Sequence, residues 1–113
     1  MRLFLYGTLL DAATLASFSG DPVLPRRVAP ATLRGWQRVG VGKGRYPTLR
    51  RHRTDRVQGA LLAVPARALA RLAAYESPGY RLARVVVQTP TGNTVAHTWI
   101  APGGTRRPWP KGS

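Results

Sequence analysis

Near its N-terminus the chain reads RLFLYGTL over residues 2–9, and this stretch says most about the architecture. Its first five residues are rich in leucine and aromatic side chains and alternate loosely, which predicts a buried β-strand that ends at Gly7. Asp11 can cap a helix, and apolar residues at helical spacing precede a Ser-Gly stop, so residues 11–18 are predicted to form a short helix. The loop over residues 6–9 therefore connects a strand end to a helix start.

The middle of the chain is predicted to consist of strands separated by loops. Three prolines between residues 21 and 30 each remove a backbone donor and restrict the preceding residue, which favours irregular chain. Two glycines within the following β-rich run indicate a strand that bends. The predicted segments are a loop over 21–30, a bent strand over 31–41, a turn over 42–45, extended chain over 46–49, a charged turn over 50–56 and a strand over 57–64.

The second half of the chain is predicted to add a helix and a hairpin. Pro65 stands at the favoured first position of a helix, which ends near Tyr75 because a Pro-Gly pair follows, and Glu76 then lies at the helix end. Two β-rich runs, over 80–89 and 93–101, flank a Pro-Thr-Gly turn and predict a hairpin. This order of elements indicates an α+β domain around a compact curved sheet.

The composition is typical of one small domain. The chain has 113 residues, and its 43% hydrophobic residues suffice for a core. We expect a single domain over residues 1–101 and a loosely attached basic tail with Gly and Pro over 102–113. Without cysteine, disulfides, thiolate metal ligands and a cysteine nucleophile are excluded. No stretch approaches the roughly 20 apolar residues of a membrane span, and the apolar start is too short for a signal peptide, so we expect a cytoplasmic location and no membrane partner.

Glu76 is the only glutamate in the chain and the candidate for acid–base chemistry. A carboxylate acts as a base near neutral pH only when burial raises its pKa, and Leu72, Tyr75 and Tyr80 are the neighbours able to bury it. The alternative, a solvated glutamate at a helix end, stays open on these residues alone.

The loop formed by Tyr6, Gly7, Thr8 and Leu9 is the candidate for ligand binding. Free backbone N–H groups and the helix dipole favour a bound anion such as a carboxylate at a strand-to-helix connection, and a glycine permits close approach of the backbone. An ordinary tight connection is the alternative that the same residues allow.

The remaining motifs argue against a metal site, a serine nucleophile and a phosphate-binding loop. His52 and His97 lie far apart and lack cysteine partners, so we predict no metal site. The serines do not stand in a G-x-S-x-G elbow, which argues against a serine nucleophile. The glycine-rich segment over residues 40–44 lacks the Walker spacing and its Ser or Thr.

The charge of the chain raises nucleic acid as a partner. Eighteen Lys and Arg against four Asp and Glu give a formal net charge of +14. The phosphate-facing residues would be Arg50, Arg51, Arg53 and Arg56, assisted by Arg106-Arg107 in the tail. The recognition motifs of the common nucleic-acid-binding folds are absent, and a GC-rich genome also produces an Arg and Ala bias. The sequence therefore favours this partner less than a small molecule.

Five segments, taken in order, form a pattern: Tyr6-Gly7-Thr8-Leu9, Tyr46-Pro47, Val57-Gln58-Gly59, Leu72-Ala73-Ala74-Tyr75-Glu76 and Tyr80-Arg81. Together they resemble the gamma-glutamylcyclotransferase-like family, from residue 3 to about residue 101. The resemblance implies a small mixed β-barrel with flanking short helices, in which the first-strand loop and the YE glutamate converge on one cavity.

The resemblance also implies a reaction. Family members convert gamma-glutamyl amines or peptides into 5-oxoproline and a free amine, through attack of the substrate's own α-amino group on its γ-carbonyl, and no cofactor or metal is implied. The expected catalytic residue is Glu76. The expected substrate-binding residues are Tyr6, Gly7, Thr8, Leu9 and Tyr80.

This chain departs from the family pattern beside the YE pair. Family members commonly show an aspartate before the pair and a glycine after it, whereas this chain has Ala73 and Ser77. The change bears on the local geometry and on the substrate that is accepted. A non-catalytic member that binds a small anionic metabolite in the same cavity is the alternative, and release of 5-oxoproline distinguishes the two.

Overall fold

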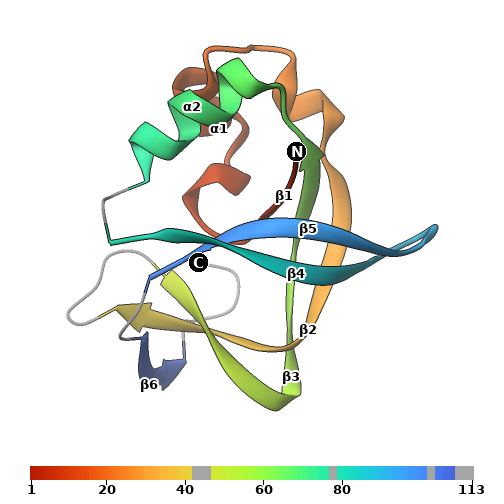
Figure 1. Ribbon diagram of the computed structural model, residues 1–113, viewed down its shortest axis with the longest axis vertical. Helices are drawn as coiled ribbons and strands as arrows, with labels where there is room; N and C mark the ends of the chain where they lie inside the picture. The colour runs from red at the N-terminus through yellow and green to blue at the C-terminus, as the bar shows by residue number, and fades with distance from the viewer. Residues whose placement is uncertain (42–46, 77–78, 102–103, 109–113) are drawn as a thin grey trace.

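The computed structural model describes residues 1–41, 47–76, 79–101 and 104–108. Two short helices lie together at one end of the molecule, and long curved strands form the rest (Figure 1). The elements, with η for a 3₁₀ turn, are β1 (Arg2–Leu5), η1 (Thr8–Leu10), α1 (Ala12–Ser19), η2 (Leu24–Arg27), β2 (Ala29–Val41), β3 (Pro47–Ala63), α2 (Ala66–Tyr75), β4 (Arg81–Thr89), β5 (Gly92–Ile100) and β6 (Gly104–Pro108).

Five of the strands close into a mixed barrel. Their order is β3-β1-β5-β4-β2, and an additional pairing of β2 with β3 joins the two ends. Strand β1 runs parallel to β5, while the other pairs are antiparallel. Strand β6 pairs with β2 as a sixth member of the sheet. The predicted α+β class and the small mixed barrel with flanking helices are confirmed.

The predicted strand and helix at the N-terminus are also confirmed. The Asp11 carboxylate caps α1, because it accepts hydrogen bonds from the Thr14 backbone N–H at 2.9 Å and from the Thr14 hydroxyl at 2.8 Å. The same bonds lower the pKa of Asp11. Helix α1 ends at Gly20, whose φ of 73° is a left-handed conformation that glycine adopts without a steric penalty.

The prediction of a charged turn over 50–56 is wrong. Strand β3 is continuous through these residues, and the turn is replaced by a bend within the strand. At the bend the pairing with β2 shifts, from Arg34 opposite Arg56 to Trp36 opposite Arg51. Pairing with a long neighbour keeps the segment extended, although its local composition predicts a turn, since tertiary context overrides strand propensity.

The loop predicted over 21–30 is shorter than expected. It contains η2, and β2 already begins at Ala29, with Pro30 opposite Ala60. A proline fits here because it is the second residue of the strand, before the pairing with β4 at Thr32.

The predicted tail contains a strand. Residues 104–108 form β6, with Pro108 opposite Val39 and Gly104 opposite Val41, so this part of the tail is attached to the sheet. The turn predicted over 42–45 and the residue Tyr46 lie outside the described residues.

Strand β1 separates two apolar cores. Leu3 and Leu5 pack with leucines of α1 and α2 on one face, whereas Phe4 and Tyr6 point into the barrel on the other. Successive side chains of a strand point to opposite faces, so β1 is anchored on both. Each fully buried Leu or Phe contributes roughly 1.5–3 kcal/mol. The loop that follows β1 is therefore held by a strand with three of its four residues buried.

Strands β1 and β3 approach each other closely at Gly59. A Cβ at this position would lie 2.2 Å from the Leu5 carbonyl oxygen and 2.7 Å from the Phe4 ring. Neither backbone nor a packed ring can move away cheaply, so the crossing requires glycine.

Candidate active site

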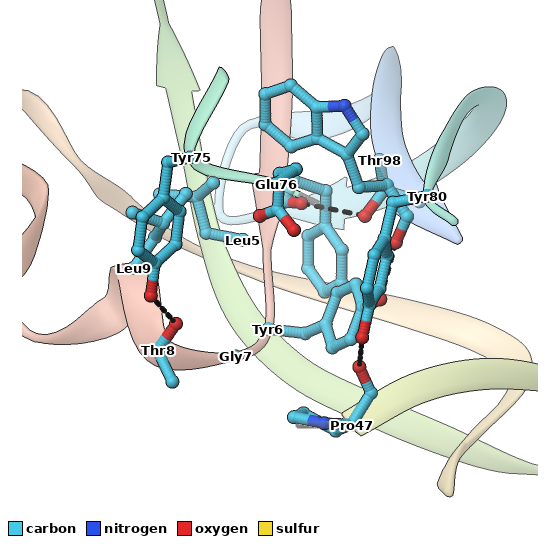
Figure 2. A pocket seen from close by; sticks show the side chains of 12 residues that line it. Leu5, Tyr6, Gly7, Thr8, Leu9, Pro47, Tyr75, Glu76, Tyr80 and Thr98 are labelled. Atoms are coloured by element: carbon cyan, nitrogen blue, oxygen red, sulfur yellow. Dashed lines mark hydrogen bonds between the residues drawn. The ribbon is translucent and has the colours of Figure 1, made fainter. Parts of the chain in front are cut away.

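A cavity of about 140 Å³ opens where β1 runs into η1. It is smaller than the roughly 300–1,000 Å³ of a pocket for a drug-sized ligand, and it suits a small metabolite. Figure 2 shows the carboxyl group of Glu76 turned into this hollow, between Tyr75 and Tyr80. The residues that line the cavity are Phe4, Leu5, Tyr6, Gly7, Thr8, Leu9, Pro47, Tyr75, Glu76, Tyr80, Thr98 and Trp99.

The loop after β1 turns as a single 3₁₀ turn beneath the cavity. The Leu10 N–H donates to the Gly7 carbonyl at 3.0 Å, and the Asp11 N–H donates to the Thr8 carbonyl at 3.1 Å. The amides of Gly7, Thr8 and Leu9 precede the first donor of this turn, so no carbonyl of the turn can accept from them. The turn itself therefore uses none of these three N–H groups.

Gly7 keeps the cavity open on the side of Pro47. Its φ is –121°, so glycine is not needed there for a left-handed conformation. A Cβ would stand 3.5 Å from the Pro47 ring, an ordinary contact, and would occupy space between two walls of the cavity.

Glu76 enters the site from the end of α2. Its backbone N–H donates to the Leu72 carbonyl at 3.0 Å and closes the helix, while the chain turns extended at this residue. Burial raises the pKa of the Glu76 carboxyl group from 4.5 to about 7, because the charged form loses solvation. The side chain is half-buried, and Arg81, the sequence neighbour that would lower this pKa by pairing, is exposed at the start of β4.

Three tyrosine hydroxyls around the cavity are held in place. Tyr6 donates to the Trp99 carbonyl, and Tyr80 donates to the Pro47 carbonyl at 3.0 Å. The Tyr75 and Thr8 hydroxyls share a hydrogen bond of 2.6 Å, which ties the end of α2 to the loop (Figure 2). Burial raises the pKa of Tyr6 well above its usual range, so this hydroxyl stays neutral.

Two buried threonines form side-chain hydrogen bonds with the backbone inside the barrel. The Thr98 hydroxyl donates to the Phe4 carbonyl at 2.8 Å. The Thr48 hydroxyl donates to the Ala101 carbonyl at 3.2 Å and accepts from the Ala101 N–H at 2.8 Å. Their hydroxyl groups are thus used within the barrel, and Glu76 is the only carboxylate among the described residues that line the cavity.

The structure brings all six predicted site residues together. Glu76 and the predicted binding residues Tyr6, Gly7, Thr8, Leu9 and Tyr80 line the same cavity. Sequence reasoning missed Thr98 and Trp99, which reach the site because β5 lies beside β1. No local pattern marks these two residues, since only the register of non-adjacent strands places them. Ser77, the second departure from the family pattern, lies outside the described residues.

The described residues contain neither a candidate metal site nor a helix that could span a membrane. His52 lies in β3 and His97 in β5, and the described part of the chain has no group of three side chains able to hold a metal ion. None of the helices in the described ranges is long and apolar enough to span a membrane.

The fold recurs in solved structures of low sequence identity. An Arabidopsis thaliana protein solved in solution has a TM-score of 0.75 and 23% identity, over 97% of this chain and 74% of the other. A gamma-glutamyl cyclotransferase has a TM-score of 0.74 and 17% identity, over 93% of this chain and 68% of the other. An AIG2-like protein from Mus musculus has a TM-score of 0.59 and 15% identity, over 99% of this chain and 97% of the other. At these identities the likeness concerns the fold.

The family is shown by the sequence. No curated protein matches the chain. The model of one family matches residues 3–112, nearly the whole chain, and it is described as gamma-glutamyl cyclotransferase, AIG2-like. The match includes the loop after β1 and the end of α2, the two segments that meet at the cavity. The chain therefore belongs to the AIG2-like gamma-glutamyl cyclotransferase family.

Proposed function

We propose that the protein is an enzyme of the gamma-glutamyl cyclotransferase type, which releases 5-oxoproline and a free amine from a gamma-glutamyl amine or peptide. The observation that carries the proposal is the half-buried Glu76 carboxyl group, which faces a small cavity and has a pKa of about 7. A group with this pKa takes up and releases protons readily at neutral pH. Membership of the family supports the same reaction class.

The reaction needs few protein groups, because the nucleophile and the electrophile belong to one molecule. The α-ammonium group of the substrate gives a proton to the Glu76 carboxylate, and the freed amine attacks the γ-carbonyl carbon. The bond from this carbon to the leaving nitrogen then breaks while Glu76 returns the proton to that nitrogen. The attacking nitrogen gives its second proton to the released amine, which leaves as an ammonium ion, and keeps one hydrogen as the lactam N–H. The products are 5-oxoproline and an amine, and the carboxylate is restored.

The rest of the site holds the substrate in its folded conformer. Such orientation is worth up to about 7–11 kcal/mol in an intramolecular reaction. The backbone N–H groups of Gly7, Thr8 and Leu9 bind the polar end of the substrate, since the 3₁₀ turn leaves them unused. Tyr6 and Tyr80 form the aromatic walls, and their hydroxyls donate to backbone carbonyls.

Release of 5-oxoproline from a panel of gamma-glutamyl compounds tests the proposal. We expect turnover by the unaltered protein and a 10²- to 10⁴-fold lower kcat in Glu76→Gln, the range typical of general acid–base catalysis. We also expect kcat/KM to rise with pH through an apparent pKa near 7, and this limb to vanish in the variant. Asp11→Asn is the matched control, because it also removes one carboxylate and asparagine still caps a helix.

Two outcomes would contradict the proposal. One is a folded Glu76→Gln protein with full turnover. The other is a protein that binds 5-oxoproline in calorimetry but releases none from any compound of the panel, which would identify a non-catalytic binding member of the family. A crystal structure with 5-oxoproline bound away from Glu76 would exclude the site in either case. The cytoplasmic location stays a prediction from the sequence.

A further inference from the structure

We propose that Tyr75 is a positioning residue of the site, which holds the loop over residues 7–9 in place against the Glu76 carboxyl group. The inference rests on the proposed function, because it assigns a role within that reaction. Tyr75 is the last residue of α2 and directly precedes Glu76, and it lines the cavity. It transfers no proton itself and acts through the two segments that it joins.

The two halves of the site come from distant parts of the chain. The loop follows β1, which is anchored in both apolar cores, whereas Glu76 follows the last residue of α2, where the chain turns extended. An intramolecular reaction gains its rate from orientation, so a shift of about 1 Å between the two halves costs up to about 10²-fold in rate. A contact that fixes their separation therefore bears directly on turnover.

The side chain of Tyr75 makes such a contact. Its hydroxyl shares a hydrogen bond of 2.6 Å with the Thr8 hydroxyl, across 67 residues of sequence (Figure 2). Its ring packs on Phe18 of α1, with the ring centroids 4.2 Å apart and an angle of 43° between the ring planes. The hydrogen bond fixes the tip of the side chain and the ring contact fixes its body. Helices α1 and α2 and the loop are thus joined at one residue.

The hydrogen-bond partner distinguishes Tyr75 from the other two tyrosines of the cavity. The hydroxyls of Tyr6 and Tyr80 donate to backbone carbonyls of β5 and β3, which are strands of the barrel. The Tyr75 hydroxyl instead reaches Thr8, the central residue of the loop whose amides bind the substrate in the proposed reaction. It therefore connects the helix that precedes Glu76 to the substrate-binding loop.

This hydrogen bond contributes more to position than to stability. It is exposed, and water replaces a lost partner at such a place at little cost. Tyr75→Phe removes the hydroxyl and retains the ring, so the packing on Phe18 and the burial of Glu76 are kept. We expect its Tm to fall by less than about 4 °C. Its effect on the reaction then reports the position of the loop rather than loss of the fold.

Steady-state release of 5-oxoproline by Tyr75→Phe, Thr8→Val and the double variant tests the proposal. We expect each single change to lower kcat roughly tenfold and to change KM by less than about threefold, because misaligned substrate still binds but reacts less often. The double variant should lose no more than either single variant, since both changes break the same bond. Thr8→Ser retains a hydroxyl and should recover most of the loss. The rise of kcat/KM with pH should persist in Tyr75→Phe, because Glu76 stays buried.

Thr32→Val is the matched control for the loss of a threonine hydroxyl. Thr32 also donates a side-chain hydrogen bond to a residue far along the chain, at 2.9 Å to the Gln58 amide oxygen. It does not belong to the residues that line the cavity. We therefore expect this variant to keep the kcat of the unaltered protein.

The ¹⁵N relaxation of the backbone amides over residues 7–9 tests the contact without a substrate. We expect order parameters of about 0.85 in the unaltered protein and values nearer 0.6 in Tyr75→Phe. Unchanged order parameters in Tyr75→Phe would overturn the proposal, and so would kcat losses of the two single variants that add up in the double variant. If the unaltered protein releases no 5-oxoproline, the proposed function fails, and the order parameters alone decide whether Tyr75 holds the loop.

Discussion

The Glu76 carboxyl group links the chemistry of the cavity to the stability of the protein. Its pKa rises to about 7 because the fold removes water from the charged form. The folded state therefore binds a proton between pH 4.5 and about 7 that the unfolded state has lost. The free energy of unfolding falls as the pH rises through this window and is constant above it.

Glu76→Gln is predicted to stabilise the fold at pH 8. After allowance for the exposed part of the side chain, the charged form costs about 1–2 kcal/mol, and a neutral amide of the same shape avoids this cost. At pH 4 the two proteins should be equally stable, because the glutamate is then protonated in both states. Urea unfolding at both pH values measures the difference. A variant that is less stable at pH 8 than the unaltered protein would show that the carboxylate is stabilised rather than strained.

Single residues were predictable from the sequence where the chemistry is local. Glu76 is the only glutamate, and the 6–9 loop lies between a strand and a helix, so both were found before the fold was known. Thr98 and Trp99 were not, because they join the site through the parallel pairing of β5 with β1, which no local pattern encodes. The raised pKa of Glu76 also depends on the packed cavity, because the cavity determines how far the carboxyl group is buried.

Strands β1 and β3 lie too close at Gly59 to leave room for a side chain. Gly59→Ala places a methyl group 2.2 Å from the Leu5 carbonyl oxygen, so we predict a loss of about 3 kcal/mol or more. Gly35→Ala, on the neighbouring strand β2, is the matched control. It has open space around it and a φ of 85°, so it should cost only about 1–2 kcal/mol from backbone strain.

Thermal or urea unfolding of the two alanine variants measures the difference. If Gly59→Ala and Gly35→Ala destabilised the protein equally, β1 and β3 would be able to move apart at little cost. The fold would then not require glycine at position 59. Leu5 and Phe4 also line the cavity, so Gly59→Ala should distort it. We therefore expect the more strongly destabilised variant to bind 5-oxoproline more weakly as well.

Element boundaries were predictable where capping or turn residues mark them. Helix α1 is marked by its capping residues Asp11 and Gly20. The β4–β5 hairpin is marked by its Pro-Thr-Gly turn. The bend of β3 was not identified as part of a strand, since the arginine-rich composition of 50–56 resembles that of an exposed turn. Pairing with β2 determines its conformation, and a partner strand is not visible in the segment itself.

At the scale of the whole molecule, the barrel closes without β6. The ring consists of β3, β1, β5, β4 and β2, and among the described residues β6 pairs only with β2. The domain limit at residue 101 stays a prediction, which truncation tests. A chain that ends at residue 101 should fold cooperatively, with a free energy of unfolding lower by about 1 kcal/mol and a Tm lower by roughly 4–8 °C.

A chain that ends at residue 108 is the control for this truncation. It retains β6, so a Tm above that of the chain ending at residue 101 measures what β6 contributes. A broad, non-cooperative transition of the shorter chain alone would show that β6 is required for closure of the sheet.

Because β1 has one face in each of the two apolar cores, the helical layer and the barrel cannot come apart without displacing the loop that follows it. The cavity consequently has no separate melting step of its own. Heat inactivation and global denaturation should coincide, and no half-folded species would retain a competent pocket.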